Sequence, residues 1–535
     1  MGINYAKQSG VSNKQTSQQD FIPGRESEQA KNNAGGVSFV IDRLSRLRRF
    51  LILGSEGGTY YVGERKLTKE NATNAISTIK SDGMAVLNML VEISDQALAK
   101  SNDPAIFVLA LCFAHGSPEV KAAAEKSLPM VCRIGTHLFH FVGYAKDLIG
   151  WNRRLARAVS NWYTQRSDEK LEMQMVKYQS RDGWSHHDVL HLCHAKPLTP
   201  VQDNLFYWAK KGVSKNVELE GKFLAGYREA HADKENIPKI VKLIKENGLS
   251  REMLPTECLG DKRIWEAMLP HMGYEAMLRN LGKMSSIGLV ERFGDNRNLI
   301  VEKILNTEQI AKSRIHPFAI LLAMRVYGQG HGVKGQLSWM ADQKIVAALD
   351  DAFYASFKNV QPSGGRVLLG LDVSGSMGSP MMGSPITCRE ASAAMALVTA
   401  KVEKDYEVMG FSTGFIDLKI NEKDTLASAT KKVSGLPFQG TDCSLPMVWA
   451  SKHGIKNIHG FVIYTDNETW AGDIHPSQAL RSYRNSYGPQ AKLAVVAMSG
   501  TQFSIADPQD SGQLDFVGFD ASAPSLLSEF IAGKL

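Results

Sequence analysis

Apolar residues in the last third of the chain fall into short uncharged runs that are separated by longer amphipathic segments. The run Val367 to Leu371 carries no charge, which is typical of a strand buried on both faces of a parallel sheet. Such runs recur, so the pattern predicts strands over 367–372, 406–411, 460–465, 493–498 and 516–519, with helices over 387–403, 444–452, 476–487 and 524–532. This alternation predicts a doubly wound α/β domain over residues 366–535.

From residue 68 to about residue 352 the pattern instead predicts helices nearly throughout. Apolar positions recur at helical spacing in segments of roughly 12 to 20 residues. Turn sequences such as Asn102-Asp-Pro104 and Gly116-Ser-Pro118 separate these segments and open the next helix. Because this rhythm is typical of stacked helix pairs of the HEAT kind, we expect an α-solenoid or ring over residues 37–360, followed by a linker over 361–365.

The first 36 residues have a different composition. They are rich in Gln, Ser, Asn and Gly, contain few large apolar groups, and end in Gly35-Gly36. Such a segment buries too little apolar surface to offset the entropy lost on ordering. The sequence therefore predicts a flexible or loosely docked arm over residues 1–36.

Hydropathy and cysteine usage bear on the compartment. The longest apolar stretch, 105–114, is too short to span a bilayer, and the polar start predicts no signal peptide. The six cysteines include no Cys-x-x-Cys pair, which favours buried thiols in a reducing compartment over disulfides or a zinc cluster. We expect a cytoplasmic protein with no membrane partner.

The charge is divided unevenly along the chain. Residues 1–365 contain 48 Lys+Arg and 38 Asp+Glu, a net charge of +10, whereas residues 366–535 contain 14 and 17, a net charge of −3. A basic domain points to a polyanion such as nucleic acid, and a solvated basic surface is the alternative.

One short motif follows the first predicted strand of the α/β domain. Asp372-Val-Ser374-Gly-Ser376 places a carboxylate and two hydroxyls at the carboxyl end of that strand, where α/β sheets bind ligands. Oxygen donors of this kind suit a hard divalent cation, Mg²⁺ first among them. Asp372 could instead cap a helix. It could also be the nucleophile of a phosphatase of the haloacid dehalogenase type, but that chemistry needs a second carboxylate where this chain has Ser374, so the motif favours binding over hydrolysis.

A row of cations marks the helical part. Lys170, Lys177 and Arg181 occupy positions i, i+7 and i+11, close to one line along a predicted helix. Further cations and aromatic residues lie close by in the sequence: Arg153, Arg154, Arg157, Trp162, Tyr163 and Trp184. Phosphate neutralisation with base stacking would use such a set, which predicts RNA binding. The alternative is that the aromatic residues belong to the core and the cations are solvated.

A histidine pair follows this segment. His187 and His191, four residues apart with Asp188 between them, resemble the helix of a zinc metalloprotease. That motif uses Glu as its general base, and Asp188 is one methylene shorter. The sequence therefore does not favour zinc hydrolysis.

The motif around Asp372 resembles the metal-ion-dependent adhesion site of von Willebrand factor A domains. The resemblance implies that Asp372, Ser374 and Ser376 are metal ligands. It also implies a ligand hydroxyl from Thr441, in Gly440-Thr441-Asp442, and a role for Asp466, at the end of the strand over 460–465, in holding a metal-bound water.

Longer motifs resemble the TROVE-domain family, which contains the Ro autoantigen and its bacterial relatives. The resemblance runs from about residue 37 to the end of the chain. Its motifs are Gly54-Ser-Glu-Gly-Gly-Thr-Tyr-Tyr61, Lys177-Tyr-Gln-Ser-Arg181-Asp-Gly-Trp184, Leu192-Cys-His194-Ala-Lys-Pro197, Met277-Leu-Arg-Asn-Leu-Gly-Lys-Met284 and Ser313-Arg-Ile-His-Pro-Phe318.

This resemblance implies a ring of HEAT-like repeats closed by the von Willebrand factor A-like domain. It implies that small noncoding Y RNAs bind the outer surface of the ring through Lys177, Arg181 and His194. It further implies that single-stranded 3′ ends of misfolded noncoding RNAs enter the central hole. An exoribonuclease, polynucleotide phosphorylase, is tied to bacterial relatives through Y RNA.

The sequence as a whole predicts a non-enzymatic RNA-binding ring that acts in RNA quality control. We expect it to be a monomer within a ribonucleoprotein and to hold a divalent metal, Mg²⁺. An alternative function is a helical scaffold whose metal domain captures a carboxylate of a protein partner. A metallohydrolase is the third possibility.

Overall fold

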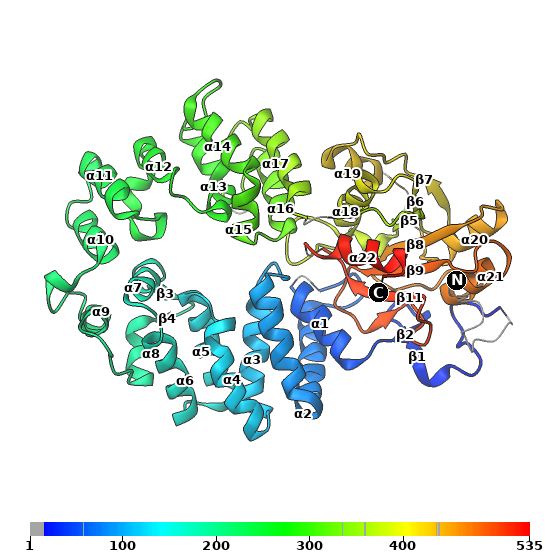
Figure 1. Ribbon diagram of the computed structural model, residues 1–535, viewed down its shortest axis with the longest axis horizontal. Helices are drawn as coiled ribbons and strands as arrows, with labels where there is room; N and C mark the ends of the chain where they lie inside the picture. The colour runs from blue at the N-terminus through cyan, green and yellow to red at the C-terminus, as the bar shows by residue number, and fades with distance from the viewer. Residues whose placement is uncertain are drawn as a thin grey trace.

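The computed structural model describes residues 15–56, 58–333, 335–357, 360–434, 436, 439–519 and 521–534. Two bodies lie side by side in it: a ring of helices around a central opening, and an α/β domain built on a six-stranded sheet (Figure 1). The described ends of the chain lie on the α/β domain, so the chain leaves this domain, runs around the ring and returns. The predicted fold class is confirmed.

The first half of the ring runs from the α/β domain to the far side of the opening. Its helices are α1 (Arg43–Leu53), α2 (Glu64–Gln96), α3 (Asp103–His115), α4 (Pro118–Val131), α5 (Gly135–Ile149), α6 (Arg153–Thr164), α7 (Asp168–Lys177), α8 (His186–Cys193) and α9 (Pro200–Lys211). Pro104 and Pro118 stand in the first turns of α3 and α4, where proline is tolerated because the N–H groups there have no helical partner. The long helix α2 has a kink at Asp82, where φ is −149° and ψ is 62°.

The second half returns toward the α/β domain. Its helices are α10 (Lys222–Ala232), α11 (Ile237–Asn247), α12 (Lys262–Met268), α13 (Tyr274–Ser286), α14 (Asp295–Leu305), α15 (Thr307–Ser313), α16 (Pro317–Gly328) and α17 (Gln343–Ala355). No helix among the described residues is both long enough and apolar enough to cross a membrane. All six cysteines are free and buried, as their scattered positions predicted.

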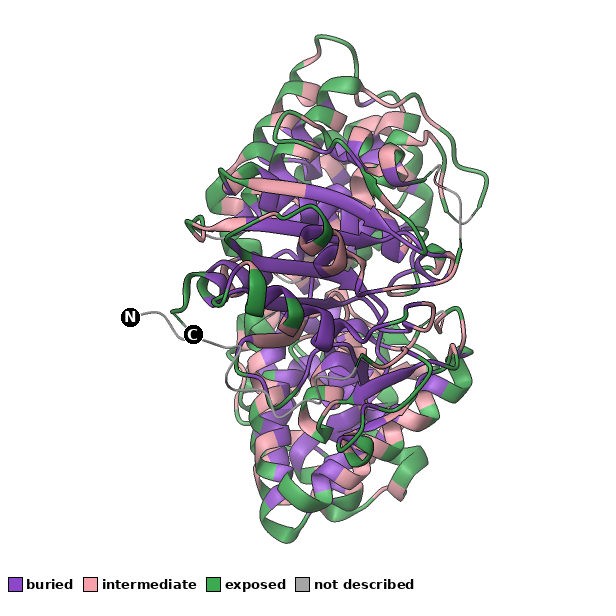
Figure 2. Cartoon of the chain, turned by 90° about the vertical axis from the view of Figure 1, so that its right-hand side faces the viewer, coloured by how far each residue is buried: buried purple, intermediate pink, exposed green. Residues whose placement is uncertain are grey.

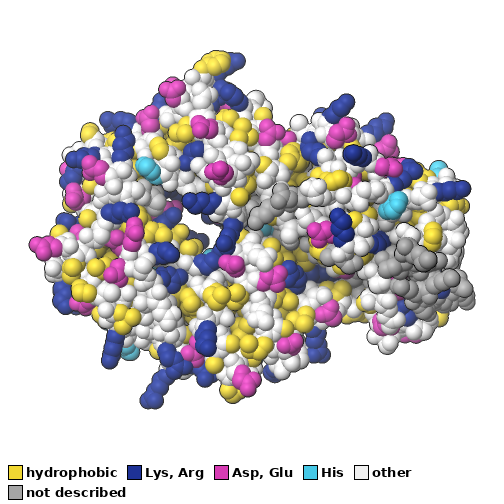
Figure 3. Space-filling model, viewed as in Figure 1, with side chains coloured by type: hydrophobic (Ala, Val, Ile, Leu, Met, Phe, Trp, Pro, Cys, Tyr) yellow, Lys and Arg dark blue, Asp and Glu magenta, His cyan; other side chains and the backbone are white. Residues whose placement is uncertain are grey.

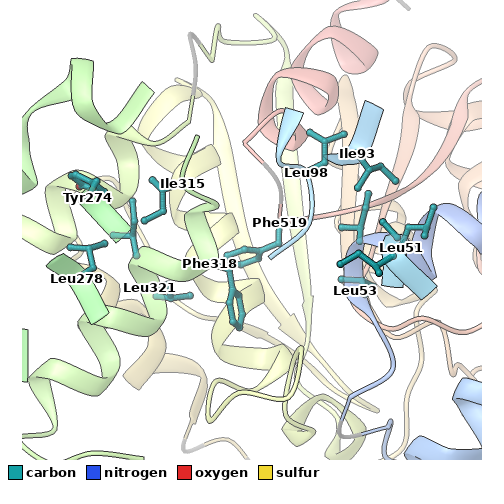
Figure 4. Close-up of a cluster of buried hydrophobic side chains, with 14 of the residues drawn as sticks. Leu51, Leu53, Ile93, Leu98, Tyr274, Leu278, Ile315, Phe318, Leu321 and Phe519 are labelled. Carbon is teal, nitrogen blue, oxygen red and sulfur yellow. The ribbon is translucent and has the colours of Figure 1, made fainter. Parts of the chain in front are cut away.

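Aromatic contacts join the C-terminal end of the ring to the α/β domain. The ring of Phe519, from the α/β domain, lies 5.3 Å from that of Phe318 at the start of α16, edge to face. Figure 4 shows these two residues between the side chains that precede α3, such as Leu98, and those of α13 and α16, such as Leu278. Because apolar burial is the main favourable term in folding, this cluster closes the ring.

Strands and helices alternate in the α/β domain, as predicted. The sheet order is β11-β9-β8-β5-β6-β7, parallel except for the edge strand β7. The strands are β5 (Arg366–Asp372), β6 (Tyr406–Phe411), β7 (Phe415–Asp417), β8 (Ile458–Thr465), β9 (Lys492–Ala497) and β11 (Gln513–Val517), and the helices are α18 (Cys388–Val402), α19 (Leu426–Ser434), α20 (Leu445–Lys452), α21 (Pro476–Ser486) and α22 (Ala523–Ala532). The pattern did not predict β7 or α19, which are short and partly exposed.

The central strands are buried on both faces (Figure 2). Alternate residues of β5 and β8 belong to different apolar clusters: Leu369 and Val462 join the core that continues into the ring, and Leu368 and Phe461 join the core beneath α20 and α21. Since successive side chains of a strand point to opposite faces, one face of the sheet packs against α18 and α22, in a core that continues into the ring.

Residues 15–42 pack on the α/β domain. β1 (Gln29–Lys31) and β2 (Val37–Val40) form a small antiparallel sheet with β10 (Phe503–Ser504), and the ring helices begin only at Arg43. The guanidinium of Arg25 donates to both carboxylate oxygens of Asp507, at 2.8 and 2.6 Å, in a buried site. The arm predicted to be flexible or loosely docked is therefore firmly packed over residues 15–36. This packing left no local signal in the sequence, because the partners of the arm lie more than 400 residues away along the chain. Residues 1–14 lie outside the described part.

Candidate functional site

The carboxyl edge of the sheet brings two aspartates together. β5 and β8 are neighbouring strands with Leu371 opposite Tyr464, so the residues that follow them emerge side by side. Asp372 is fully buried and Asp466 is 3% exposed. The Thr465 hydroxyl, at the end of β8, donates to Asp372 Oδ2 at 2.7 Å and so fixes the orientation of this carboxylate.

The predicted hydroxyl ligands lie at the same edge. Ser374 and Ser376 are buried, with their hydroxyl oxygens 3.0 Å apart, and Ser376 and Asp466 line the same cavity. Thr441 is 1% exposed, and its carbonyl accepts the N–H of Trp470 at 3.0 Å, which ties its loop to the segment that follows β8. All five residues predicted from the adhesion-site motif thus lie at one buried edge, and metal binding by them stays a prediction.

The electrostatics of this edge fit a cation. Burial, followed by the charges of Asp372 and Glu468, raises the pKa of Asp466 well above its usual range. Burial likewise raises the pKa of Asp372, although Arg389, which donates to the Ser374 carbonyl at 2.8 Å, acts in the opposite direction. Two adjacent carboxylates without water repel each other, and a divalent cation between them would offset that cost.

The donor set also has the right chemistry for Mg²⁺. Two carboxylates and three hydroxyls supply hard oxygen ligands and leave room for water, which Mg²⁺ retains. Residues that a metal site needs are therefore present, and an ion held there would supply a hard positive charge able to accept one more oxygen ligand.

Two further acids of this edge are held by the N-terminal arm. Glu468 accepts hydrogen bonds from the backbone N–H and the side-chain amide of Asn33, both at 2.7 Å. Asp442 accepts one from the side-chain amide of Gln18, also at 2.7 Å. Sequence reasoning assigned no role to Glu468, because its partner is 435 residues away and only the fold brings the two together.

The histidine pair does not form a recognisable zinc site. The rings of His187 and His191 lie 4.6 Å apart on the exposed side of α8. In the described part of the chain no three His, Cys, Asp or Glu side chains are grouped so that they could hold a metal ion. Asp188 instead completes a capping box with Ser185 at the start of α8.

The predicted cations of α7 lie on the surface. Lys170 is exposed, and Lys177, at the last position of the helix, is half-buried with its ammonium 4.0 Å from Glu252. Arg181 follows on β3 (Ser180–Arg181), which pairs with β4 (Trp184–Ser185) in a two-residue hairpin, and 61% of its side chain is exposed. These cations are therefore available to a ligand in solvent.

Two contacts that the sequence did not predict hold this hairpin against α5. The imidazole of His140 lies 2.6 Å from an Asp103 oxygen and 2.9 Å from an oxygen of Asp182, in the hairpin turn. The ammonium of Lys146 lies 4.9 Å above the ring of Trp184. Hydrogen bonding to Asp103 raises the pKa of His140, so the ring is a cation between two carboxylates at mildly acidic pH.

His194 and Arg153 lie at the ends of two other helices. His194 is exposed at the end of α8, and Arg153 is exposed at the start of α6. The indole N–H of Trp151 donates to the carbonyl of Leu192 at 2.8 Å and so ties these two helix ends together.

Other residues of the predicted interface have different roles. Trp162 and Tyr163 are fully buried, so the expectation of base stacking on them is wrong and they belong to the core. Arg157, whose side chain is 61% exposed, pairs with Glu125 of α4 at 2.8 Å, as does Arg154 at the same distance, and RNA binding by Arg157 stays a prediction. Because the partner of Arg157 lies on another helix, its sequence position beside the cationic row did not reveal this pairing.

The central opening of the ring is also basic. Lys and Arg side chains border the opening (Figure 3). Burial, and then the charge of Arg314, lowers the pKa of Arg133, which shows that cations from distant helices lie close together. Arg314, after α15, contacts Asp95 of α2 at 3.1 Å. A polyanion entering the ring would meet a positive field.

Comparison with known proteins agrees with this architecture. The TROVE domain profile matches residues 30–245 and 229–326, and the Ro60 vWA domain profile matches residues 366–531. The RNA-binding protein RO60 of Caenorhabditis elegans is 36% identical over 586 residues, covering 95% of this chain and 90% of that protein. The protein of the same name from Deinococcus radiodurans is 37% identical over 513 residues, covering 95% and 96%.

A solved structure shares the fold. The crystal structure of the Deinococcus radiodurans RO (RSR) protein matches with a TM-score of 0.71 and 37% identity, over 92% of this chain and all of that one. Both domains match a family profile, and the relatives align over nearly the whole chain. The chain therefore belongs to the Ro60 family of TROVE-domain proteins.

Proposed function

We propose that this protein binds RNA, with small noncoding Y RNAs on the outer surface of the ring and single-stranded 3′ ends of misfolded RNAs in its opening. The observation that carries the proposal is the group of surface cations on α7 and the adjoining hairpin, the half-buried Lys177 and the exposed Arg181, on a basic ring that also exposes His194 at the end of α8. The names of the relatives, which are RNA-binding proteins, support RNA as the ligand.

In this proposal the outer surface of the ring and its central opening bind different kinds of RNA. Structured RNA has phosphates and 2′-hydroxyls that suit exposed Lys and Arg side chains on a convex face. A single strand is thin enough to enter an opening and is attracted there by the Lys and Arg side chains that border it (Figure 3). A protein that retains aberrant RNA without cutting it would act in RNA quality control in the cytoplasm. An exoribonuclease such as polynucleotide phosphorylase, recruited through Y RNA, would supply the cleavage.

The test of RNA binding is crosslinking in the native cell. The protein is purified after ultraviolet crosslinking and the attached RNA is sequenced. Small structured RNAs together with 3′ ends of defective transcripts are the expected products. Recovery of no RNA above the level of an unrelated protein of similar charge would contradict the proposal.

We also propose that the carboxyl edge of the sheet binds Mg²⁺ without hydrolytic chemistry. Asp372, Ser374, Ser376, Thr441 and Asp466 would hold the ion, with its remaining positions taken by water. Calorimetric titration of the metal-free protein with Mg²⁺ tests this. We expect one site in the wild type that disappears in Asp372→Ala, and an unchanged heat of binding in the variant would exclude the site.

A further inference from the structure

The N-terminal arm binds the segment 466–469, which follows β8 and carries a proposed metal ligand at its first position. All four residues of this segment are buried. The hydroxyl of Ser38, on β2, donates to the backbone carbonyl of Asn467 at 3.3 Å, and the side-chain amide of Asn32 donates to that of Thr469 at 2.7 Å. The arm therefore supplies hydrogen-bond donors to buried carbonyl groups that lie more than 400 residues away along the chain.

Asn33 acts on the ligand Asp466 through Glu468. The carboxylate of Glu468 accepts the backbone and side-chain N–H groups of Asn33, both at 2.7 Å, and the backbone N–H of Ala34 at 3.2 Å, so the arm satisfies both of its oxygens. The backbone N–H of Glu468 in turn donates to Asp466 Oδ1 at 3.2 Å. Because one residue is held by the arm through its side chain and orients the ligand through its N–H, the position of Asn33 influences the carboxylate of Asp466.

Gln18 joins the two loops that supply the ligands outside the Asp-x-Ser-x-Ser motif. Its side chain is fully buried, its amide N–H donates to Asp442 Oδ1 at 2.7 Å, and its amide oxygen accepts the hydroxyl of Thr469. Asp442 directly follows the proposed ligand Thr441, so the Gln18 amide connects the Thr441 loop to the segment after β8. The contact is close: a Cβ atom on Gly472 would lie 2.3 Å from both the Gln18 nitrogen and Asp442 Oδ1.

We propose that Asn33 and Gln18 are positioning residues of the metal site, and that docking of the N-terminal arm and binding of the ion strengthen each other. This inference rests on the proposed Mg²⁺ site. Two of its five predicted ligands, Thr441 and Asp466, lie in the loops that the arm holds, so the docked arm lowers the cost of ordering them around an ion. Because such coupling is reciprocal, a bound ion should hold the arm more tightly by the factor by which the arm raises the affinity for the ion.

Two measurements on the full chain test this inference. Calorimetric titration with Mg²⁺ compares Asn33→Ala with Glu28→Ala. Asn33 is exposed, so its truncation removes a hydrogen bond without opening a cavity in the core. Glu28 is the matched control, because it lies in the same arm but contacts Arg25 and Gln509 and no residue of the segment after β8. Amide hydrogen exchange of the wild type, with Mg²⁺ and with a chelator, measures the reverse effect of the ion on the arm and needs no substitution there.

The expected result is specific to the contact with Glu468. Asn33→Ala should bind Mg²⁺ about fivefold more weakly, the size expected when one ordinary hydrogen bond is removed, while Glu28→Ala binds it as the wild type does. Mg²⁺ should slow exchange of the arm amides 32–38 severalfold in the wild type and not in Asp372→Ala. An unchanged affinity in Asn33→Ala, or arm exchange that Mg²⁺ does not slow, would overturn the role of the arm and leave intact a metal site that still depends on Asp372. Binding of Mg²⁺ by Asp372→Ala as by the wild type would overturn the site itself.

Discussion

The carboxyl edge of the sheet and the cationic surface around α7 are both charged, but they lie in opposite environments. At the edge, Asp372 and Asp466 are buried, oriented by hydrogen bonds and covered by residues from two distant segments. Around α7, Lys170 and Arg181 extend into solvent from one helix and one hairpin. Charge without water has a high energy unless it is paired, whereas exposed charge is tolerated without a partner.

This difference separates the two kinds of binding. A buried, preorganised site suits a small ion that remains bound, and a flexible exposed surface suits a long polyanion that is exchanged. It also predicts that substitutions at the edge act mainly on stability and metal retention, and that those around α7 act mainly on association and its dependence on salt.

The largest effect is expected from the buried ion pair that docks the N-terminal arm on the α/β domain. Arg25→Met leaves Asp507 charged and buried, since the two side chains are 5% and 1% exposed. We expect a loss of about 3–5 kcal/mol in the free energy of unfolding, measured from urea denaturation. The matched control is Arg279→Met, whose exposed pair with Glu275 lies on the ring and should change stability by at most about 0.5 kcal/mol. Equal losses in the two variants would remove the distinction between the regions.

A somewhat smaller effect on the free energy of unfolding should come from Mg²⁺ binding at the carboxyl edge of the sheet. Mg²⁺ at about a hundredfold excess over its dissociation constant should stabilise the wild type by about 2.7 kcal/mol, because it binds the folded state alone. Asp372→Asn should abolish this increment, seen as the difference in thermal unfolding with Mg²⁺ and with a chelator. Retention of the increment in the variant would place the ion elsewhere.

Charge reversal on the cationic surface should weaken RNA binding without unfolding the protein. For Lys177→Glu and Arg181→Glu we expect the slope of log affinity against log salt concentration to become shallower by about 0.7–0.9 for each phosphate that the protein no longer neutralises. Fluorescence anisotropy with a labelled small structured RNA measures this. Lys242→Glu is the control, because Lys242 is also exposed and lies on α11, away from the hairpin. A slope that changes equally in the control would mean that only net charge matters.

The smallest effect concerns the contacts of His140 with Asp103 and Asp182, which hold the β3–β4 hairpin against α5, and it depends on pH. The pKa of His140 is raised in the folded protein, chiefly by hydrogen bonding to Asp103, so its stabilisation is fully present below about pH 6.5 and is lost as pH rises through the raised value. Asp103, whose pKa is lowered, remains ionised over this range, and burial keeps the pKa of the neighbouring His137 at about 4. We therefore expect His140→Gln to cost about 1 kcal/mol at pH 6 and less at pH 8.5 in urea unfolding. A pH-independent cost would show that the imidazole acts through packing alone.

Local patterns of the sequence accounted for the elements of both regions. Uncharged apolar runs located the central strands to within two residues of each end, because a strand buried on both faces excludes charge whatever its neighbours are. The edge strand β7 and the helix α19 were missed, since they are short and only partly buried. The i, i+7 spacing likewise predicted that Lys170 and Lys177 lie on the same side of α7. This prediction needs no tertiary contact, because the helical period alone sets the relative direction of the two side chains.

The sequence by itself determined the two architectures, the motif around Asp372 and the row of cations, because each depends on periodicity or spacing within one segment. Only the tertiary structure decided which partners these residues have: Asn33 for Glu468, Glu125 for Arg157, and the core for Trp162. These contacts join segments far apart in the chain, and they exist only once apolar burial has closed the ring against the sheet.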